Sequence, residues 1–219
     1  GATVALGQRS ASFPDVPEGS WAADAVGFAA VRGLFGGAPG GAFVPGEPMT
    51  RAMLAVVLAR MDGREASGGA GQPWYGGALS WAVENGILQG SGGDLNPDGA
   101  LTREQLCTIL ARYAGHAGLT LEQTDAAETF SDSGAVSGWA AGSVEFCLRA
   151  GLLTGRPGGR MDPKGQATRA EIAVILTRFI EAALRCGGFP RCKDRRTGRG
   201  PFWSAPRPPQ LIKEVPEVF

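Results

Sequence analysis

Thr168-Arg-Ala-Glu171 is the most informative segment for the fold, because a helix start stands there directly before a buried helix face. Apolar residues follow at helical spacing, at Ile172 and at Ile175-Leu176. The same order of residues recurs earlier in the chain, at Thr50-Arg51 and at Thr102-Arg103. A helix start that is repeated three times predicts one structural unit present in three copies.

Residues on both sides of this stretch repeat in register. Each copy begins at a tryptophan (Trp21, Trp74 and Trp139), with glycines 12 and 16 positions later. Thr-Arg follows the tryptophan by 29, 28 and 29 positions, and the copies start 53 and 65 residues apart. We expect repeats at about 13–62, 72–114 and 130–182. The uneven spacing favours a closed pseudo-threefold domain, 13–182, over a regular solenoid.

Composition excludes several classes of protein. The chain has 219 residues, 43% of them apolar, and no formal net charge, which does not indicate disorder or nucleic-acid binding. Residues 1–184 are mildly acidic, whereas the tail, 183–219, is basic and rich in proline. No apolar run approaches the ~20 residues of a membrane span, so we expect no membrane insertion. The N-terminal residues lack a signal-peptide pattern, so an exported protein would be present in processed form.

The four cysteines do not indicate a metal site. Cys107 and Cys147 fall in helical patterns where the sister copies carry alanine, which predicts small buried residues. Cys186 and Cys192 flank a short loop and could form a disulfide or remain thiols. There is no C-x-x-C pair, and the single histidine, His116, lies among glycines, so no metal and no cofactor are expected.

Each copy is interpreted as helix, turn, loop, helix, which makes the fold all-α. In the first copy the leading helix should run over 21–32 with Ser20 as its cap, and Gly33 should end it in a left-handed conformation. The loop leads to an apolar residue, a variable residue and a proline, as in Phe43-Val-Pro45, and is expected to be extended. The second helix begins at the threonine, with a full capping box in copies two and three only.

The arginine after each threonine needs its own explanation. Arg51, Arg103 and Arg169 place a cation at a helix N-terminus, against the helix dipole. Such an arginine beside free backbone amides could hold a carboxylate or a phosphate. Alternatively, each arginine could pair with an acidic residue of the neighbouring copy, such as Asp15 or Asp132. The two interpretations can coexist.

The entry to each copy supplies further candidates for binding. Phe13-Pro-Asp15 precedes Trp21, and Phe130-Ser-Asp132 precedes Trp139, whereas Trp74 has no such aspartate before it. An aromatic face, a carboxylate and an arginine suit a carbohydrate with an acidic substituent. The three tryptophans could equally be core residues at helix starts.

Together, these motifs resemble the S-layer homology (SLH) module of bacterial cell-surface proteins. Thr168-Arg-Ala-Glu171 and Phe13-Pro-Asp-Val16 match it best, whereas copy two lacks the aspartate. The resemblance implies three helical modules with grooves between them, on an extracellular protein of the bacterial cell wall. The grooves would bind secondary cell-wall polysaccharide carrying a pyruvate ketal, or a peptidoglycan-associated glycan. Arg51, Arg103 and Arg169 would then contact the ketal.

Three functions remain open on the sequence alone. The first is non-catalytic glycan binding that anchors the protein at the cell surface. The second is a protein-binding scaffold with degenerate grooves and an interface on the tail, 183–219. The third is a glycan hydrolase using two carboxylates among Asp15, Asp132, Glu104 and Glu171. No catalytic motif surrounds these acids, so we expect no enzyme and no catalytic residues.

Overall fold

The computed structural model describes residues 12–64, 66–90, 94–125 and 129–186. Within those ranges the chain is all-helical, with isolated bridges between extended residues instead of strands. A single 3-10 turn, Ser133–Ala135, accompanies six α-helices: α1 (Ala23–Val31), α2 (Arg51–Met61), α3 (Gly76–Glu84), α4 (Arg103–His116), α5 (Ala141–Arg149) and α6 (Arg169–Arg185). The all-α prediction is therefore confirmed.

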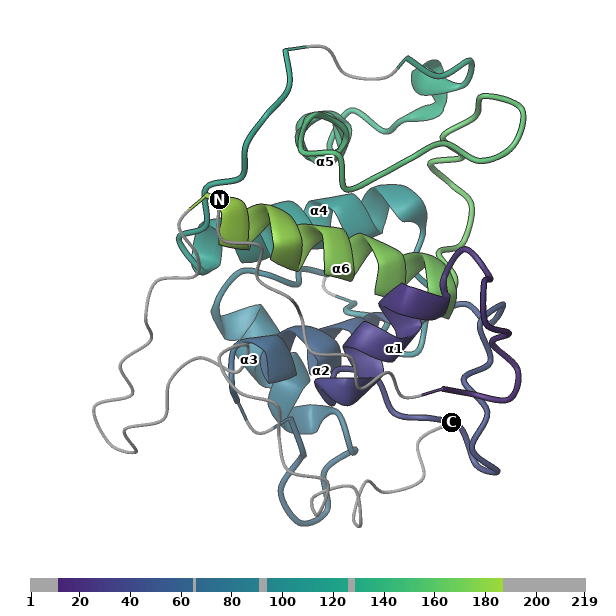
Figure 1. Cartoon of the computed structure of the whole chain (residues 1–219). Helices are drawn as coiled ribbons and strands as arrows, with labels where there is room; N and C mark the ends of the chain where they lie inside the picture. The colour runs from purple at the N-terminus through teal and green to yellow at the C-terminus, as the bar shows by residue number, and fades with distance from the viewer. Residues whose placement is uncertain (1–11, 65, 91–93, 126–128, 187–219) are drawn as a thin grey trace.

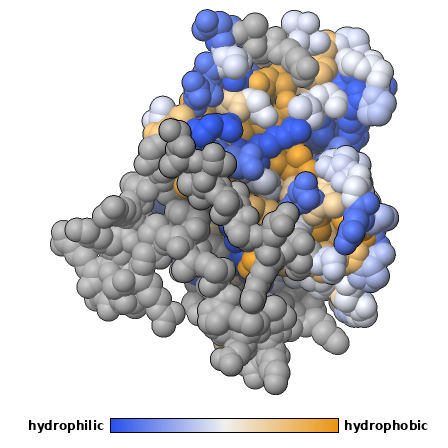
Figure 2. Space-filling model, viewed as in Figure 1, coloured by the Kyte–Doolittle hydropathy of each residue, from blue (hydrophilic) through white to orange (hydrophobic). Residues whose placement is uncertain are grey.

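The helices pack in pairs that join neighbouring repeats. The second helix of each repeat lies against the first helix of the next one, as α2 with α3, α4 with α5, and α6 with α1. In Figure 1, α6 crosses the centre near α4, with α5 above them and α1, α2 and α3 below. Because the last pair returns to the first repeat, all three repeats share a single buried core. The face drawn in Figure 2 mixes hydrophilic and apolar residues.

A ring of three backbone hydrogen bonds closes this arrangement. The residues just before the threonines, Met49, Leu101 and Ala167, are all fully buried. Met49 N–H donates to Ala167 O at 3.1 Å, Ala167 N–H to Leu101 O at 2.9 Å, and Leu101 N–H to Met49 O at 2.8 Å. Each residue therefore donates to one neighbouring repeat and accepts from the other. Buried backbone groups need such partners, so the three repeats depend on one another.

Most of the predicted helix ends are confirmed. Thr50, Thr102 and Thr168 cap the second helices, and the capping box is complete at Thr102 and Thr168 only. Gly33, Gly86 and Gly151 follow the first helices with φ of 64°, 68° and 66°. The cap expected from Ser20 is wrong, because α1 starts later, from Ala22, without a side-chain cap.

The expectation of an extended Phe43-Val-Pro45 segment is also wrong. Its middle residue, Val44, has a φ of 58°, and the equivalent Asn96 and Asp162 have 42° and 55°. Asn and Asp tolerate this left-handed conformation, whereas a β-branched valine is strained in it. The apolar residue at the first position is buried in two copies, as Phe43 and Met161.

The cysteine predictions are tested in part. Cys107 and Cys147 are both buried thiols, in α4 and α5, as expected from the alanines at equivalent positions. Cys186 is exposed at the end of α6, and Cys192, its suggested partner, lies outside the described residues. Among the described helices, none combines the length and the hydropathy needed to cross a lipid bilayer.

The strained valine generates a first prediction. Val44→Asn should raise the free energy of unfolding by about 0.5–1 kcal/mol, because asparagine relieves the left-handed strain at a half-buried site. Chemical denaturation with urea measures the change. The matched control is Asn96→Val, which should destabilise the domain. A lower stability of Val44→Asn would contradict the assignment of strain to this position.

Candidate functional site

The arginines of the three Thr-Arg motifs all dock onto the loop of the next repeat. Arg51 donates from Nε to Leu95 O and from Nη2 to Gln89 O, both at 2.7 Å. The other two arginines repeat this geometry on equivalent carbonyls: Arg103 on Met161 (2.7 Å) and Thr154 (2.8 Å), and Arg169 on Phe43 (2.8 Å) and Gly36 (2.9 Å). Because the order runs from repeat one to two, two to three and three to one, the arginines are part of the interfaces between repeats.

The prediction of free amides at these helix starts is wrong. Arg51 N–H donates to Gly99 O and Ala52 N–H to Pro97 O, both in the next repeat. The third amide of the helix is taken by the capping hydroxyl of Thr50. The helices that start at Arg103 and Arg169 use their amides in the same way. An anion would therefore have to bind the guanidinium groups and not the backbone.

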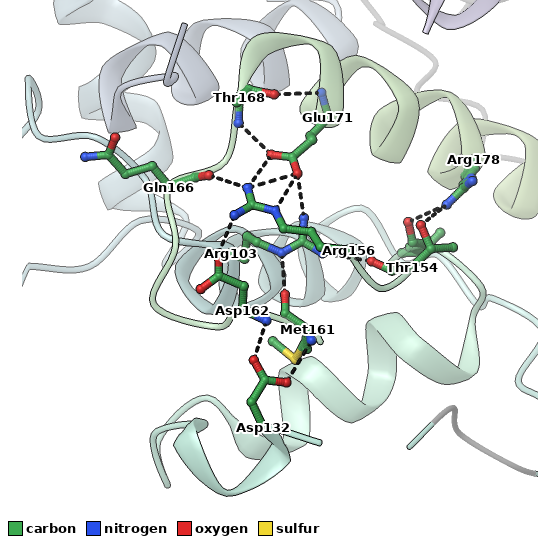
Figure 3. Close-up of polar contacts among 11 residues, drawn as sticks. Arg103, Asp132, Thr154, Arg156, Met161, Asp162, Gln166, Thr168, Glu171 and Arg178 are labelled. Atoms are coloured by element: carbon green, nitrogen blue, oxygen red, sulfur yellow. Dashed lines mark hydrogen bonds and ion pairs between the residues drawn. The ribbon is translucent and has the colours of Figure 1, made fainter. Parts of the chain in front are cut away.

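Ion pairing with the next repeat is found at one of the three arginines within the described residues. Arg103 Nη1 lies 3.1 Å from Glu171 Oε1, and only 2% of Arg103 is exposed. Arg156 approaches the same carboxylate at 2.9 Å and also pairs with Asp162. Figure 3 shows these groups converging below the start of α6. Among the described residues, the guanidinium groups of Arg51 and Arg169 donate to backbone carbonyl oxygens.

Asp15 and Asp132 hold the loops that the arginines contact. The carboxylate of Asp15 accepts from the amides of Phe43 at 2.8 Å and Val44 at 2.7 Å. Asp132 accepts from the equivalent Met161 and Asp162 amides, both at 2.8 Å (Figure 3). Each carboxylate thereby fixes a left-handed turn. A contact with sugar hydroxyls stays a prediction for both residues.

The three tryptophans differ in exposure. Trp21 and Trp139 are 69% and 59% exposed, so they are surface side chains and not core residues. Trp74 is half-buried and packs edge-on against Tyr75 at 5.2 Å between ring centroids. Trp21 and Trp139 thus keep free ring faces of the kind that stack on sugars, while Trp74 is partly used for packing.

Two clefts join these tryptophans to the arginines. Cleft A has a volume of about 330 Å³ and takes residues from all three repeats. Its lining comprises Arg51 from repeat one, Gln89, Gly90, Gln105, Thr108, Ile109 and Arg112 from repeat two, and Trp139 from repeat three. The structure thus brings one predicted arginine together with one predicted tryptophan.

Cleft B is the pseudo-symmetric counterpart of cleft A and has a volume of about 320 Å³. Arg103, Arg178 and Trp21 occupy the places of Arg51, Arg112 and Trp139. The position of Gln105 is taken by Glu171, and Arg156 is an additional lining residue. Each cleft therefore combines a Thr-Arg arginine, the second helix of the next repeat and the tryptophan of the repeat after that.

The electrostatics of cleft A favour an anion. Burial lowers the pKa of Arg51, the nearby charge of Arg112 lowers it further, and Asp94 opposes both effects. The two guanidinium groups thus repel each other within the lining. Among the described residues, no carboxylate lines this cleft. A bound anion would relieve the repulsion.

Sequence reasoning missed one interaction near cleft A. The buried Glu104 carboxylate accepts hydrogen bonds from Ser137 N at 3.0 Å and Ser137 Oγ at 3.1 Å, and from Lys164 Nζ at 2.6 Å. Ser137 precedes Trp139 by two residues, so Glu104 holds the segment that presents this ring. Its signal in the sequence was the glutamate itself, because the sister copies have Ala52 and Ala170 there.

Comparison with known families agrees with this threefold geometry. The model of the S-layer homology domain matches residues 12–53, 69–107 and 129–173, more than half of the chain. The chain belongs to the S-layer homology domain family. Membership implies anchoring to the cell wall and indicates a place at the bacterial cell surface.

Similar proteins include both surface-layer proteins and enzymes. The chain is 29% identical to an amylopullulanase of Thermoanaerobacterium thermosulfurigenes over 78% of its own length, and 28% identical to the exoglucanase XynX of Acetivibrio thermocellus over 80%. It is 25% identical to an S-layer protein of Bacillus thuringiensis subsp. finitimus over 76%. The chain spans only 10%, 17% and 21% of these three relatives, so the likeness is confined to their SLH regions.

The remaining predictions receive little test. The tail, 183–219, lies outside the described residues from 187 onward, and so does any protein interface on it. In the described part of the chain, no cluster of three potential metal-ligating His, Cys, Asp or Glu side chains is found.

The loop-fixing aspartates predict an acid-sensitive fold. The Met161 amide lowers the pKa of Asp132 below its ordinary 3.8, burial opposes this, and the Asp162 amide lowers it again. Because the pKa is lower in the folded state, this stabilisation is present above about pH 4 and is lost as the pH falls through the folded pKa.

Asp132→Asn should therefore lower the melting temperature at pH 7. Between pH 5 and pH 2 the melting temperature of this variant should fall less than that of the native domain. Calorimetric scans across this range measure both effects. Glu122→Gln, which alters an exposed carboxylate, serves as the control. An unchanged acid dependence in Asp132→Asn would contradict the role given to these amides.

Proposed function

We propose that this domain binds a negatively charged secondary cell-wall polysaccharide without catalysis and so holds its bearer non-covalently at the cell surface. The observation that carries the proposal is cleft A, which is lined by Arg51, Arg112 and the exposed Trp139, with no carboxylate among its described lining residues. Two cations would bind an acidic substituent, and the indole would stack on the sugar ring beside it.

A pyruvate ketal fits these requirements. It carries one carboxylate on a rigid ring, and a planar guanidinium can bind a carboxylate through two parallel hydrogen bonds. Arg51 already uses Nε and Nη2 for carbonyls of repeat two, which fixes the orientation of its guanidinium at the cleft. A group that is held before the ligand arrives costs less entropy on binding. Peptidoglycan-associated glycan remains the alternative ligand.

The hydrogen bonds and ion pairs of the glutamates support a function in binding rather than in hydrolysis. Glu171, which lines cleft B, is held by Arg103 and Arg156. Glu104, which holds the segment before Trp139, is bound by Lys164 and Ser137. A general acid needs a carboxyl that can exchange a proton near neutral pH. Burial is the largest single effect on the pKa of Glu104 and raises it. The hydrogen bonds from Lys164 and Ser137 and the charge of Lys164 together outweigh burial, so the pKa is lowered overall.

Binding should depend on cleft A. Arg112→Gln and Trp139→Ala should each weaken binding to purified pyruvylated wall polysaccharide by about tenfold, because each removes one direct contact worth about 1.4 kcal/mol. Isothermal titration calorimetry measures the affinity, and circular dichroism shows whether the fold is retained.

The control is Arg149→Gln, which removes the same charge from the end of α5, outside the cleft linings. Polysaccharide stripped of pyruvate should bind weakly to every form of the domain. Equal affinity for stripped and native polymer would overturn the proposed ligand.

A further inference from the structure

The two clefts are equivalent in position and their described linings carry the same formal charge, but only cleft B contains a carboxylate. Each lining residue of cleft A has a counterpart in cleft B, which adds Leu153, Arg156 and Pro157. The carboxylate of cleft B stands at the third residue of the second helix. In cleft A this is Gln105, and in cleft B it is Glu171. Both side chains accept from the backbone N–H of the capping threonine, at 3.1 Å and 2.9 Å, so both perform the same capping function.

The glutamate does something that the glutamine does not. Glu171 Oε1 also accepts from Arg103 Nη1 at 3.1 Å and from Arg156 Nε at 3.0 Å, so two of the arginines of cleft B are already ion-paired within the lining. Arg103 is almost fully buried under these contacts. In cleft A the neutral Gln105 offers Arg51 no such partner. An incoming carboxylate would have to compete with Glu171 in cleft B, but it would meet no competitor among the described residues of cleft A.

We infer that cleft A is the principal site for the acidic substituent of the glycan, and that the residue at the third helical position, Gln105 or Glu171, sets which cleft accepts it. The inference rests on the proposed function. It adds that clefts A and B differ in binding, and it assigns the difference to this residue. Arg51 and Arg112 bind the anion, and Trp139, held in place through Ser137 by Glu104, covers the ring.

The chain supplies its own pair of test variants. Gln105→Glu introduces a carboxylate into cleft A, and Glu171→Gln removes the carboxylate of cleft B. The capping interaction is available in both variants because each residue type already caps a helix here. Gln105→Glu should weaken binding to pyruvylated polysaccharide about tenfold, the loss expected when an internal carboxylate competes for the arginines. Glu171→Gln should leave the affinity unchanged or raise it. Gln123→Glu, at an exposed site, controls for net charge.

Sodium pyruvate provides a second probe that does not depend on the polymer. Its titration should shift the indole NMR signal of Trp139 in the native domain, and the shift should be reduced in Gln105→Glu. If Gln105→Glu binds as tightly as the native domain, or if only Glu171→Gln loses affinity, the inference is overturned while the proposed function stands. If the native domain binds neither pyruvylated polymer nor pyruvate, both are overturned.

A second inference comes from the buried thiols. Cys107 and Cys147 occupy register-equivalent positions of α4 and α5, the one helix pair that joins repeats two and three. At the two sister interfaces both places are alanine: Ala55 with Ala82, and Ala173 with Ala29. Cysteine thus replaces alanine in both helices of one interface and in neither helix of the other two interfaces. All six residues are buried.

The structure places the Cys147 side chain against Cys107 in the neighbouring helix. Cys147 Sγ lies 3.8 Å from the carbonyl oxygen of Cys107, and its thiol also interacts with the Cys107 side chain. We propose that Cys107 and Cys147 form a disulfide between α4 and α5 when the chain folds at the oxidising cell surface. Both S–H bonds break, one S–S bond forms, and two protons leave. The oxidant is a second disulfide, which takes up the two electrons and the two protons and becomes two thiols.

Oxidation should occur before the helices close. The Cys107 side chain and then burial raise the pKa of Cys147 well above its ordinary value, so little reactive thiolate exists in the folded domain. A bond formed during folding would close a loop of 40 residues and tie repeat two to repeat three. It should raise the melting temperature by about 5–10 °C relative to the reduced chain.

Peptide mass spectrometry tests this after the chain is refolded with glutathione disulfide. A cross-linked peptide pair containing Cys107 and Cys147 is expected, together with a fall in melting temperature on unfolding and refolding with reductant. Cys107→Ala/Cys147→Ala, which copies the sister interfaces, should fold and lose this redox dependence. Alkylation of both thiols under denaturing, non-reducing conditions would overturn the proposal.

Discussion

The domain depends on backbone groups that are satisfied only between repeats. The ring through Met49, Leu101 and Ala167 buries three amides and three carbonyls at the centre, and each finds its partner in another repeat. Around this ring, the first two backbone amides of α2, α4 and α6 donate to the loop of the next repeat. The guanidinium group of the first residue in each of these helices donates to the same loop. An unpaired buried backbone group costs free energy comparable to a lost hydrogen bond. Removing one repeat would leave several such groups without partners, so each repeat depends on the other two.

This constraint also produces the candidate binding sites. In clefts A and B an arginine reaches forward to the next repeat and the tryptophan of the repeat after that lines the same cleft, so both clefts contain residues from all three repeats. The arginine therefore has a structural function in addition to the proposed one. Its Nε and Nη2 hold the loop, and in cleft A the remaining part of the guanidinium faces the cleft beside Arg112.

Local patterns in the sequence predicted local structure well. Threonine caps, glycine stops and the apolar stripes of the second helices require only nearby residues, and the structure confirms them. The left-handed Val44 was not predictable, because valine disfavours this conformation and the Asp15 carboxylate that holds it lies 29 positions earlier. The loss of the free amides at Arg51 likewise depended on carbonyls of another repeat. The sequence indicated which residues mattered but not that the arginines would dock on carbonyls.

The closed ring has a consequence for how such proteins can change in length. In an open stack a further unit can be added at either end, because the terminal surface always accepts another copy. Here the donor of the third repeat meets the acceptor of the second, and the first repeat returns to the third, so no terminal surface remains. A fourth unit would find every donor and acceptor of this ring already paired, so it could join the ring only by displacing one of the three repeats.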